Sequence, residues 1–263
     1  MMLKQVLNPP NWFTSASLFC GLYAIILSGE AEGDPNLYYK AGLMIIFAGL
    51  FDMLDGRVAR MTGTGSAFGV QLDSLVDIIS FGVAPACLVY FWGLQEYERV
   101  GLVVAGLLML AGAFRLARFN VQADGKAHNW SQGLTITMGG GTVAALVMWH
   151  AGSGLAGPDN PLVLILFVLA VAFLMISEVP YRTLKTLRLS PGTLAGAVVV
   201  GGICLAIGAV YDISTVLVAL GLAHVGSGPI EALATWPRRR KVRRAEVARA
   251  RAEAKKKNER EVS

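Results

Sequence analysis

Long apolar segments alternate with short polar ones along most of the chain. Eight segments, at residues 14–28, 39–54, 69–92, 100–119, 133–151, 161–177, 192–211 and 213–228, are candidates for helices that cross a bilayer. About 20 residues at 1.5 Å rise per residue span a hydrocarbon core of about 30 Å. The pattern predicts an all-α, polytopic membrane helix bundle with about eight transmembrane helices. The count falls to six if the last two segments form a re-entrant pair.

Composition supports a membrane protein. Of 263 residues, 54% are hydrophobic and 16% are charged, whereas soluble domains carry about 25% charged residues. The three cysteines fall inside predicted spans, which argues against a disulfide framework, and the three histidines lack the spacing of metal ligands. No cleavage site for a removable signal peptide follows the first residues.

The basic residues predict the orientation, because Lys and Arg near membrane spans stay in the cytoplasm. With eight spans and both termini cytosolic, 21 of the 23 basic residues lie inside, and only Lys40 and Arg99 lie outside. The cytosolic set comprises Lys4, Arg57, Arg60, Arg115, Arg118, Lys126, Arg182, Lys185, Arg188 and twelve residues from Arg238 onward. We therefore expect a multi-pass protein of the cell membrane.

The charge divides the chain into two regions. Residues 1–236 carry 11 basic and 14 acidic side chains, whereas residues 237–263 carry 12 and 4. We expect a membrane-embedded domain over 1–236 and a basic cytosolic tail over 237–263. The tail is suited to anionic lipid headgroups, or serves only as an orientation signal. Nucleic acid is not an expected partner, because aromatic residues are not interleaved with the basic ones.

Four aspartates stand at the end of the second predicted span and the start of the third. Asp52 and Asp55 are three residues apart, and Asp73 and Asp77 are four apart, so each pair lies on one face of its helix. A short connection between antiparallel helices would aim both pairs at one point. Carboxylates at membrane depth are costly, so this group is a candidate functional site.

Such close carboxylates repel one another unless cations lie between them. Oxygen ligands without His or Cys favour Mg²⁺, Mn²⁺ or Ca²⁺, and two divalent ions would balance four carboxylates. A salt-bridge network with Arg57 and Arg60 is the structural alternative. Gly56, Gly69 and the small Ala59 would let a bulky ligand approach, and Arg60 is suited to phosphate oxygens.

These residues follow the spacing D-x2-D-G-x2-A-R-x8-G-x3-D-x3-D. The pattern resembles the signature of the CDP-alcohol phosphatidyltransferase family. The resemblance implies that Asp52, Asp55, Asp73 and Asp77 surround two divalent cations, Mg²⁺ or Mn²⁺, and that Asp77 is the catalytic base. It also implies that the cytidine diphosphate of the substrate is held by Gly56, Ala59, Arg60 and Gly69. We expect Asn11 and Thr14 to contact the nucleotide as well, with helix capping as the alternative.

Two further stretches, residues 78–86 and 113–120, resemble the serine-using branch of the family. This resemblance implies transfer of a phosphatidyl group from CDP-diacylglycerol to L-serine at the cytosolic membrane face, giving phosphatidylserine and CMP. Arg115, Arg118 and Asn120 are candidates to bind the acceptor; charge anchoring and helix capping are the alternatives. Thr135 stands where serine-using relatives commonly have Pro, so inositol phosphate, glycerol phosphate and choline remain open as acceptors.

Two other functions fit the sequence less well. A metal or proton transporter would use membrane acids, but these cluster at one side and no inverted repeat is visible. A scaffold would leave four costly aspartates unexplained. The family resemblance implies a homodimer, and Gly192 and Gly196 form a weak helix-packing motif.

Overall fold

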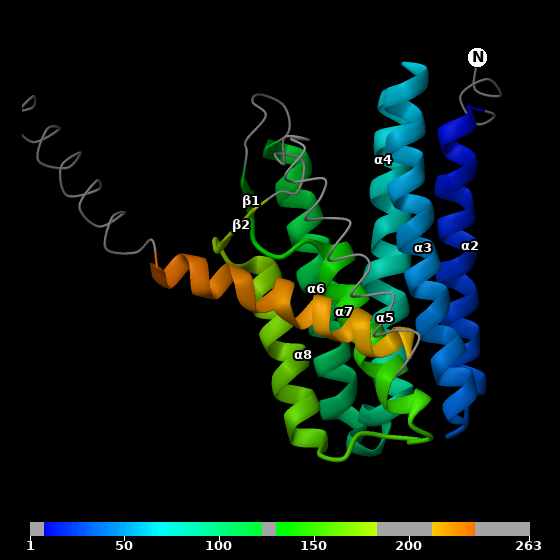
Figure 1. The fold of residues 1–263 in the computed structure, drawn as a ribbon, viewed down its shortest axis with the longest axis vertical. Coiled ribbons are helices and arrows are strands. Elements are labelled where there is room, and N and C mark those ends of the chain that lie inside the picture. The colour runs from blue at the N-terminus through cyan, green and yellow to red at the C-terminus, as the bar shows by residue number, and fades with distance from the viewer. Residues whose placement is uncertain (1–7, 123–129, 183–211, 235–263) are drawn as a thin grey trace, which may run out of the picture.

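The computed structural model describes residues 8–122, 130–182 and 212–234 (Figure 1). The long helices in these ranges are α2 (Pro9–Glu30), α3 (Pro35–Thr62), α4 (Ala67–Asp77), α6 (Glu98–Gln122), α7 (Ile136–Gly152), α8 (Pro161–Ile176) and Ile213–Ala234. Shorter turns of helix join α4 to α6: η1 (Ile78–Val83), α5 (Ala84–Val89), η2 (Tyr90–Leu94) and η3 (Gln95–Tyr97). The expected span 192–211, which includes the Gly192 and Gly196 motif, and the basic tail lie outside the described residues.

Four of the long helices begin at a polar side chain that caps the first turn. Ser66, for example, accepts a hydrogen bond from the backbone N–H of Gly69 at 3.0 Å, which satisfies one of the free donors at a helix start. Proline stands at the first turn of α2, α3 and α8, where its missing N–H costs nothing. The other capping side chains are Asp34, Thr135 and Asn160.

The predicted helical class is confirmed. Among the described residues, four helical stretches are long and apolar enough to cross a membrane, at Pro9–Glu30, Pro35–Thr62, Ala67–Gln122 and Ile213–Ala234. The third contains 56 residues and reverses at Glu98, whose φ is +42°. Helix α8 is apolar but shorter. The total of eight spans and the cytosolic location of both termini stay predictions.

The helices pack as a bundle around a continuous apolar core. Helix α2 lies along α3, α3 packs on α7, and α6 packs on α8 (Figure 1). Ile45, Phe81, Leu88, Val143 and Met175 are fully buried in this core. Large apolar side chains also cover the outer faces of the helices, as expected for surfaces that contact lipid.

A short antiparallel pair of strands, β1 (Trp130–Gln132) and β2 (Pro180–Arg182), lies at the end of α8. The hydroxyl of Tyr181 in β2 donates to the carbonyl of Val225 at 3.1 Å. This bond attaches the helix Ile213–Ala234, which runs across the bundle in Figure 1.

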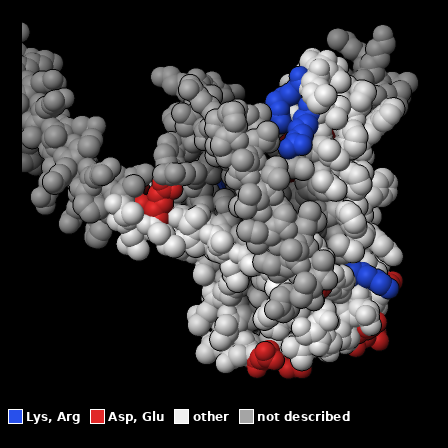
Figure 2. All heavy atoms as spheres, viewed as in Figure 1, with Lys and Arg blue, Asp and Glu red and all other residues white. Residues whose placement is uncertain are grey.

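Charged side chains are distributed unevenly between the two ends of the bundle. In Figure 2, the larger group of Lys and Arg lies near the end where α3 meets α4, and a smaller basic patch lies beside the acidic side chains near the opposite end. Asp and Glu mark that opposite end and the helix Ile213–Ala234. The N-terminal end of α2 lies at the same end as the α3–α4 connection (Figure 1).

Candidate active site

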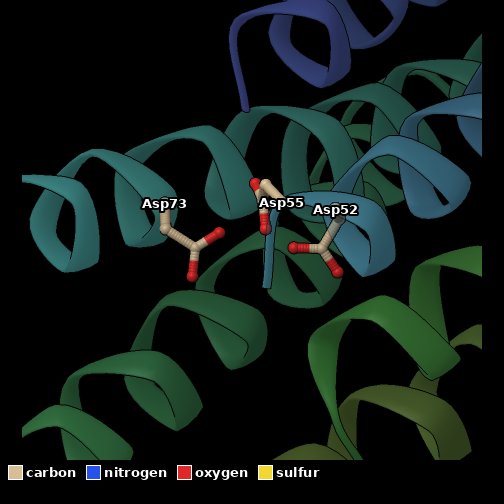
Figure 3. A group of neighbouring side chains, drawn as sticks. All are labelled: Asp52, Asp55 and Asp73. Carbon is tan, nitrogen blue, oxygen red and sulfur yellow. The ribbon is translucent and has the colours of Figure 1, made fainter. Parts of the chain in front are cut away.

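Three aspartates from two helices meet beside the α3–α4 connection. Asp52 and Asp55 come from α3 and Asp73 comes from α4, and one carboxylate oxygen from each lies within 4.8 Å of the others. Figure 3 shows the three side chains directed into one space. Asp55 is buried, whereas Asp52 and Asp73 are half-buried. The sequence prediction that the two acidic pairs converge is therefore met by these three residues.

Asp77, the last residue of α4, lies next to this group. Its carboxylate interacts with that of Asp52 and, more weakly, with that of Asp73. It is half-buried and lies where α4 passes into η1. The four carboxylates predicted from the sequence thus form one acidic cluster, with Asp77 beside the set of three.

The donor set fits a hard divalent cation. Three carboxylates whose oxygens lie within 4.8 Å of one another repel strongly when they are buried or half-buried. In the part of the chain that the structure describes, no ion pair joins Asp52, Asp55 or Asp73 to Arg57 or Arg60, so the salt-bridge alternative finds no support. Oxygen ligands alone, without Cys or His, are the donors that Mg²⁺ and Mn²⁺ prefer.

A cleft of about 140 Å³ opens beside the acidic cluster. Its lining includes Asp55 and Asp73, together with five of the six residues expected to hold the nucleotide: Asn11, Thr14, Gly56, Ala59 and Gly69. A side chain at Gly69 would lie 3.3 Å from the Oδ1 atom of Asn11. The glycine therefore lets the start of α2 approach α4 and keeps this part of the cleft open.

The sequence interpretation missed the floor and rim of this cleft. Asn8, Pro10, Val70 and the connection Thr64–Ser66 also line it. The Nδ2 group of Asn8 donates to the carbonyl of Thr64 at 2.8 Å and so joins the start of α2 to the connection. The fixed spacing of eight residues between Arg60 and Gly69 was the available signal, because it implies a connection of defined shape.

Arg60 differs from the other expected nucleotide residues. It is exposed near the end of α3 and does not line the cleft. Its Nη1 atom would lie 3.7 Å from a Cβ atom at position 56, so the guanidinium extends back along α3 toward Gly56, which does line the cleft. Contact with a bound phosphate stays a prediction for this residue.

Two of the three residues expected to bind the acceptor lie close to the acidic helix α4. Arg115 of α6 is buried, its guanidinium interacts electrostatically with Asp77, and it lies 5.2 Å from the centre of the Phe119 ring. The Nδ2 group of Asn120 donates to the hydroxyl of Ser74 at 3.0 Å. Helix α6 therefore brings polar groups to the side of the acidic cluster that faces away from α2.

Arg118 has a different environment. Its guanidinium donates to the carbonyls of Ile176 and Gln132, both at 2.8 Å, and makes longer bonds to the carbonyls of Met175 and Ser177. The side chain thus caps the end of α8 and joins it to β1. Gly133 has a φ of +79°, and a side chain there would collide with this guanidinium and two of the carbonyls. Acceptor binding by Arg118 stays a prediction.

Comparison with known proteins identifies the family of the chain. The model of the CDP-alcohol phosphatidyltransferase family matches residues 7–176. This region contains the acidic cluster, the cleft, Arg115 and Asn120.

Curated relatives agree with that match. The CDP-diacylglycerol–serine O-phosphatidyltransferase of Helicobacter pylori is 31% identical over 179 residues, covering 68% of this chain and 73% of the relative. The protein of the same name from Mycobacterium tuberculosis is 30% identical over 223 residues, covering 82% and 76%. The archaetidylserine synthase of Methanothermobacter thermautotrophicus is 36% identical over 174 residues, covering 65% and 68%. The chain belongs to the CDP-alcohol phosphatidyltransferase family.

Proposed function

We propose that this chain transfers the phosphatidyl group of CDP-diacylglycerol to L-serine, releasing CMP and forming phosphatidylserine. The observation that carries the proposal is the convergence of Asp52, Asp55 and Asp73 within 4.8 Å at the edge of a cleft. The names of the relatives from Helicobacter pylori and Mycobacterium tuberculosis, which specify serine as the acceptor, support the choice of alcohol.

The acidic cluster would hold two divalent cations, Mg²⁺ or Mn²⁺, through Asp52, Asp55, Asp73 and Asp77. When bound, these ions supply positive charge that offsets the diphosphate and the charge that develops during transfer. The protein's own part is to keep four carboxylates together despite their repulsion. Their positions on two packed helices, α3 and α4, serve that purpose.

The cleft would hold the cytidine diphosphate portion of the lipid substrate. Gly56, Ala59 and Gly69 leave backbone uncovered along α3 and α4, and Asn11 and Thr14 offer polar groups from α2. Exposed apolar side chains on α2, including Phe19 and Leu22, provide a surface on which acyl chains can remain in the bilayer.

Asp77 is the proposed general base, because it lies at the side of the acidic cluster nearest Arg115. The hydroxyl proton of serine passes to Asp77 while the serine oxygen forms a bond to the lipid-linked phosphorus. The bond from that phosphorus to the CMP oxygen breaks, and CMP leaves. Arg115 and Asn120 would bind the carboxylate and ammonium groups of serine from the α6 side.

The reaction would take place at the cytosolic face. The positive-inside pattern predicted from the sequence places the α3–α4 connection in the cytosol. The gathering of Lys and Arg near that end of the bundle (Figure 2) supports the same orientation. Soluble serine and the released CMP would then exchange directly with the cytoplasm.

The test is a transfer assay with purified protein, labelled CDP-diacylglycerol and Mg²⁺ or Mn²⁺. Serine, glycerol phosphate, inositol phosphate and choline are supplied in parallel, and a phosphatidylated product with serine alone is the expected result. Product with another alcohol would reassign the acceptor. Absence of CMP release with all four would contradict the proposed function.

The role of Asp77 is tested in the same assay. Asp77→Asn keeps the size of the side chain but removes a base, so turnover should be abolished while CDP-diacylglycerol still binds. Asp159→Asn is the matched control, because Asp159 is an exposed carboxylate in the α7–α8 connection. A near-normal rate for Asp77→Asn would rule out its assignment as the base.

A further inference from the structure

Helix α2 carries two buried hydroxyl groups on the face that meets the acidic helices. Thr14 and Ser17 are three residues apart and are exposed by only 3% and 1%. The family pattern described above assigns no role to Ser17. Residues three apart share one face of a helix, so both hydroxyls point into the same interface.

The first hydroxyl contacts the acidic cluster directly. The Oγ1 atom of Thr14 donates to the Oδ2 atom of Asp55 at 2.7 Å, and the bond is buried. A carboxylate that accepts such a bond is held in one rotamer, with its other oxygen directed elsewhere. Asp55 also lies against Asp52 and Asp73, so Thr14 orients one member of the three.

The second hydroxyl contacts the segment that follows Asp77. The Oγ atom of Ser80 donates to the carbonyl of Ser17 at 3.1 Å, and the Oγ atom of Ser17 lies 3.4 Å from Ser80 Oγ and donates to it. One turn further along α2, a side chain at Gly21 would lie 2.7 Å from the same Ser80 Oγ atom. Helix α2 therefore packs closely against η1 at Ser80, which lies three residues after Asp77.

The contact with α2 matters for η1 because η1 is wider than an α-helix. The N–H of Ala84 donates to the carbonyl of Ile79, five residues earlier, which is the bond of a π-helix. Pro85 explains this local structure: it has no N–H, and its ring would collide with the carbonyl of Phe81 in an α-helix. An extra residue in a helical turn rotates the helix before the turn relative to the helix after it, here α4 relative to α5. The direction of Asp77 relative to the core thus depends on how η1 is held.

We propose that Thr14 and Ser17 are positioning residues that set the place of both acidic helices from a common element. Thr14 orients Asp55 on α3, and Ser17, through Ser80, fixes Asp77 at the end of α4. This inference rests on the proposed function for the role of Asp77, but its first test needs no turnover. Helix α2 thus positions the acidic side chains of both α3 and α4, in addition to lining the cleft.

The first test measures Mn²⁺ binding to the purified protein by the electron paramagnetic resonance signal of free Mn²⁺, without substrate. Thr14→Val removes the hydroxyl but keeps the shape, and it should weaken Mn²⁺ binding about 10-fold or more. Thr14→Ser keeps the hydroxyl and should restore binding. Ser28→Ala is the matched control, because the equally buried Ser28 on the same helix donates to the carbonyl of Ala24 within α2, at 2.7 Å.

Equal Mn²⁺ affinities for Thr14→Val and Ser28→Ala would overturn the role of Thr14, whether or not the protein transfers phosphatidyl groups. A wild-type protein that binds Mn²⁺ but shows no transfer would contradict the proposed function alone. Because Thr14→Ser is expected to keep both the fold and the affinity, loss of binding in that variant would also count against the proposal.

The second test separates kcat from KM. Ser80→Ala removes both bonds of the serine pair, whereas Ser17→Ala leaves the bond from Ser80 to the carbonyl of Ser17. We expect kcat to be highest for Ser28→Ala, lower for Ser17→Ala and lowest for Ser80→Ala. KM for CDP-diacylglycerol should stay near the wild-type value, because η1 does not line the cleft. A raised KM with unchanged kcat, or a slower Ser17→Ala than Ser80→Ala, would overturn the role of the serine pair.

Discussion

Replacement of Arg118 tests whether this residue supports the fold or binds the acceptor. Its two shortest hydrogen bonds, both 2.8 Å long, run to the carbonyls of Ile176 and Gln132. Hydrogen bonds from a charged group contribute about 1.5–3 kcal/mol each. The side chain is half-buried, so water recovers part of this energy. We expect Arg118→Ala to lower the free energy of unfolding by about 2–4 kcal/mol.

The assay is thermal unfolding of the purified protein in detergent, combined with initial rates at varied serine concentration. Arg118→Lys should fall between wild type and Arg118→Ala, because an ammonium group cannot reproduce the planar fork of a guanidinium. Arg57→Ala is the control, since Arg57 is an exposed arginine that makes no ion pair with the acidic cluster. An unchanged unfolding temperature together with a raised KM for serine would refute the structural role and favour direct acceptor binding.

Two further changes test the cleft and the attachment of the last described helix. Gly69→Ala should raise KM for CDP-diacylglycerol without loss of stability, because a methyl group would lie 3.3 Å from Asn11 Oδ1 while Ala stabilises a helix by about 1 kcal/mol relative to Gly. Gly106→Ala, where no atom lies within 4 Å, is its control, and equal KM values would contradict the prediction. Tyr181→Phe should cost about 1 kcal/mol of stability, because the bond to Val225 is lost. Burial raises the pKa of Tyr181 to about 12, so its tyrosinate absorbance should appear only above the normal range, and an ordinary titration would mean that this contact is open.

The acidic cluster was predictable because its geometry is local. The spacing of Asp52 and Asp55 places them on one face of α3, and the short connection to α4 returns the chain to Asp73 and Asp77. The helical class followed from the length of the apolar segments. Both predictions needed only helix periodicity and the energetic cost of a charge in the membrane.

Other features depend on contacts between segments far apart in the chain. The bonds of Arg118 to the end of α8 join residues 57 to 59 positions apart, and nothing in the local pattern around Arg118 distinguishes them from charge anchoring. The wide turn of η1 has a visible cause in Pro85, but its partner Ser17 lies 63 positions from Ser80. The helix Ile213–Ala234 also extends past residue 228, where its predicted apolar segment ends.

The residues that line the cleft all fall between Asn8 and Asp73. The proposed pocket for the lipid donor is therefore encoded by residues 8–73, and Arg115 and Asn120, the proposed acceptor residues, are made only afterwards. During synthesis, α2, α3 and α4 can associate as soon as they enter the bilayer, so the proposed donor half of the site can form before the proposed acceptor half has left the ribosome.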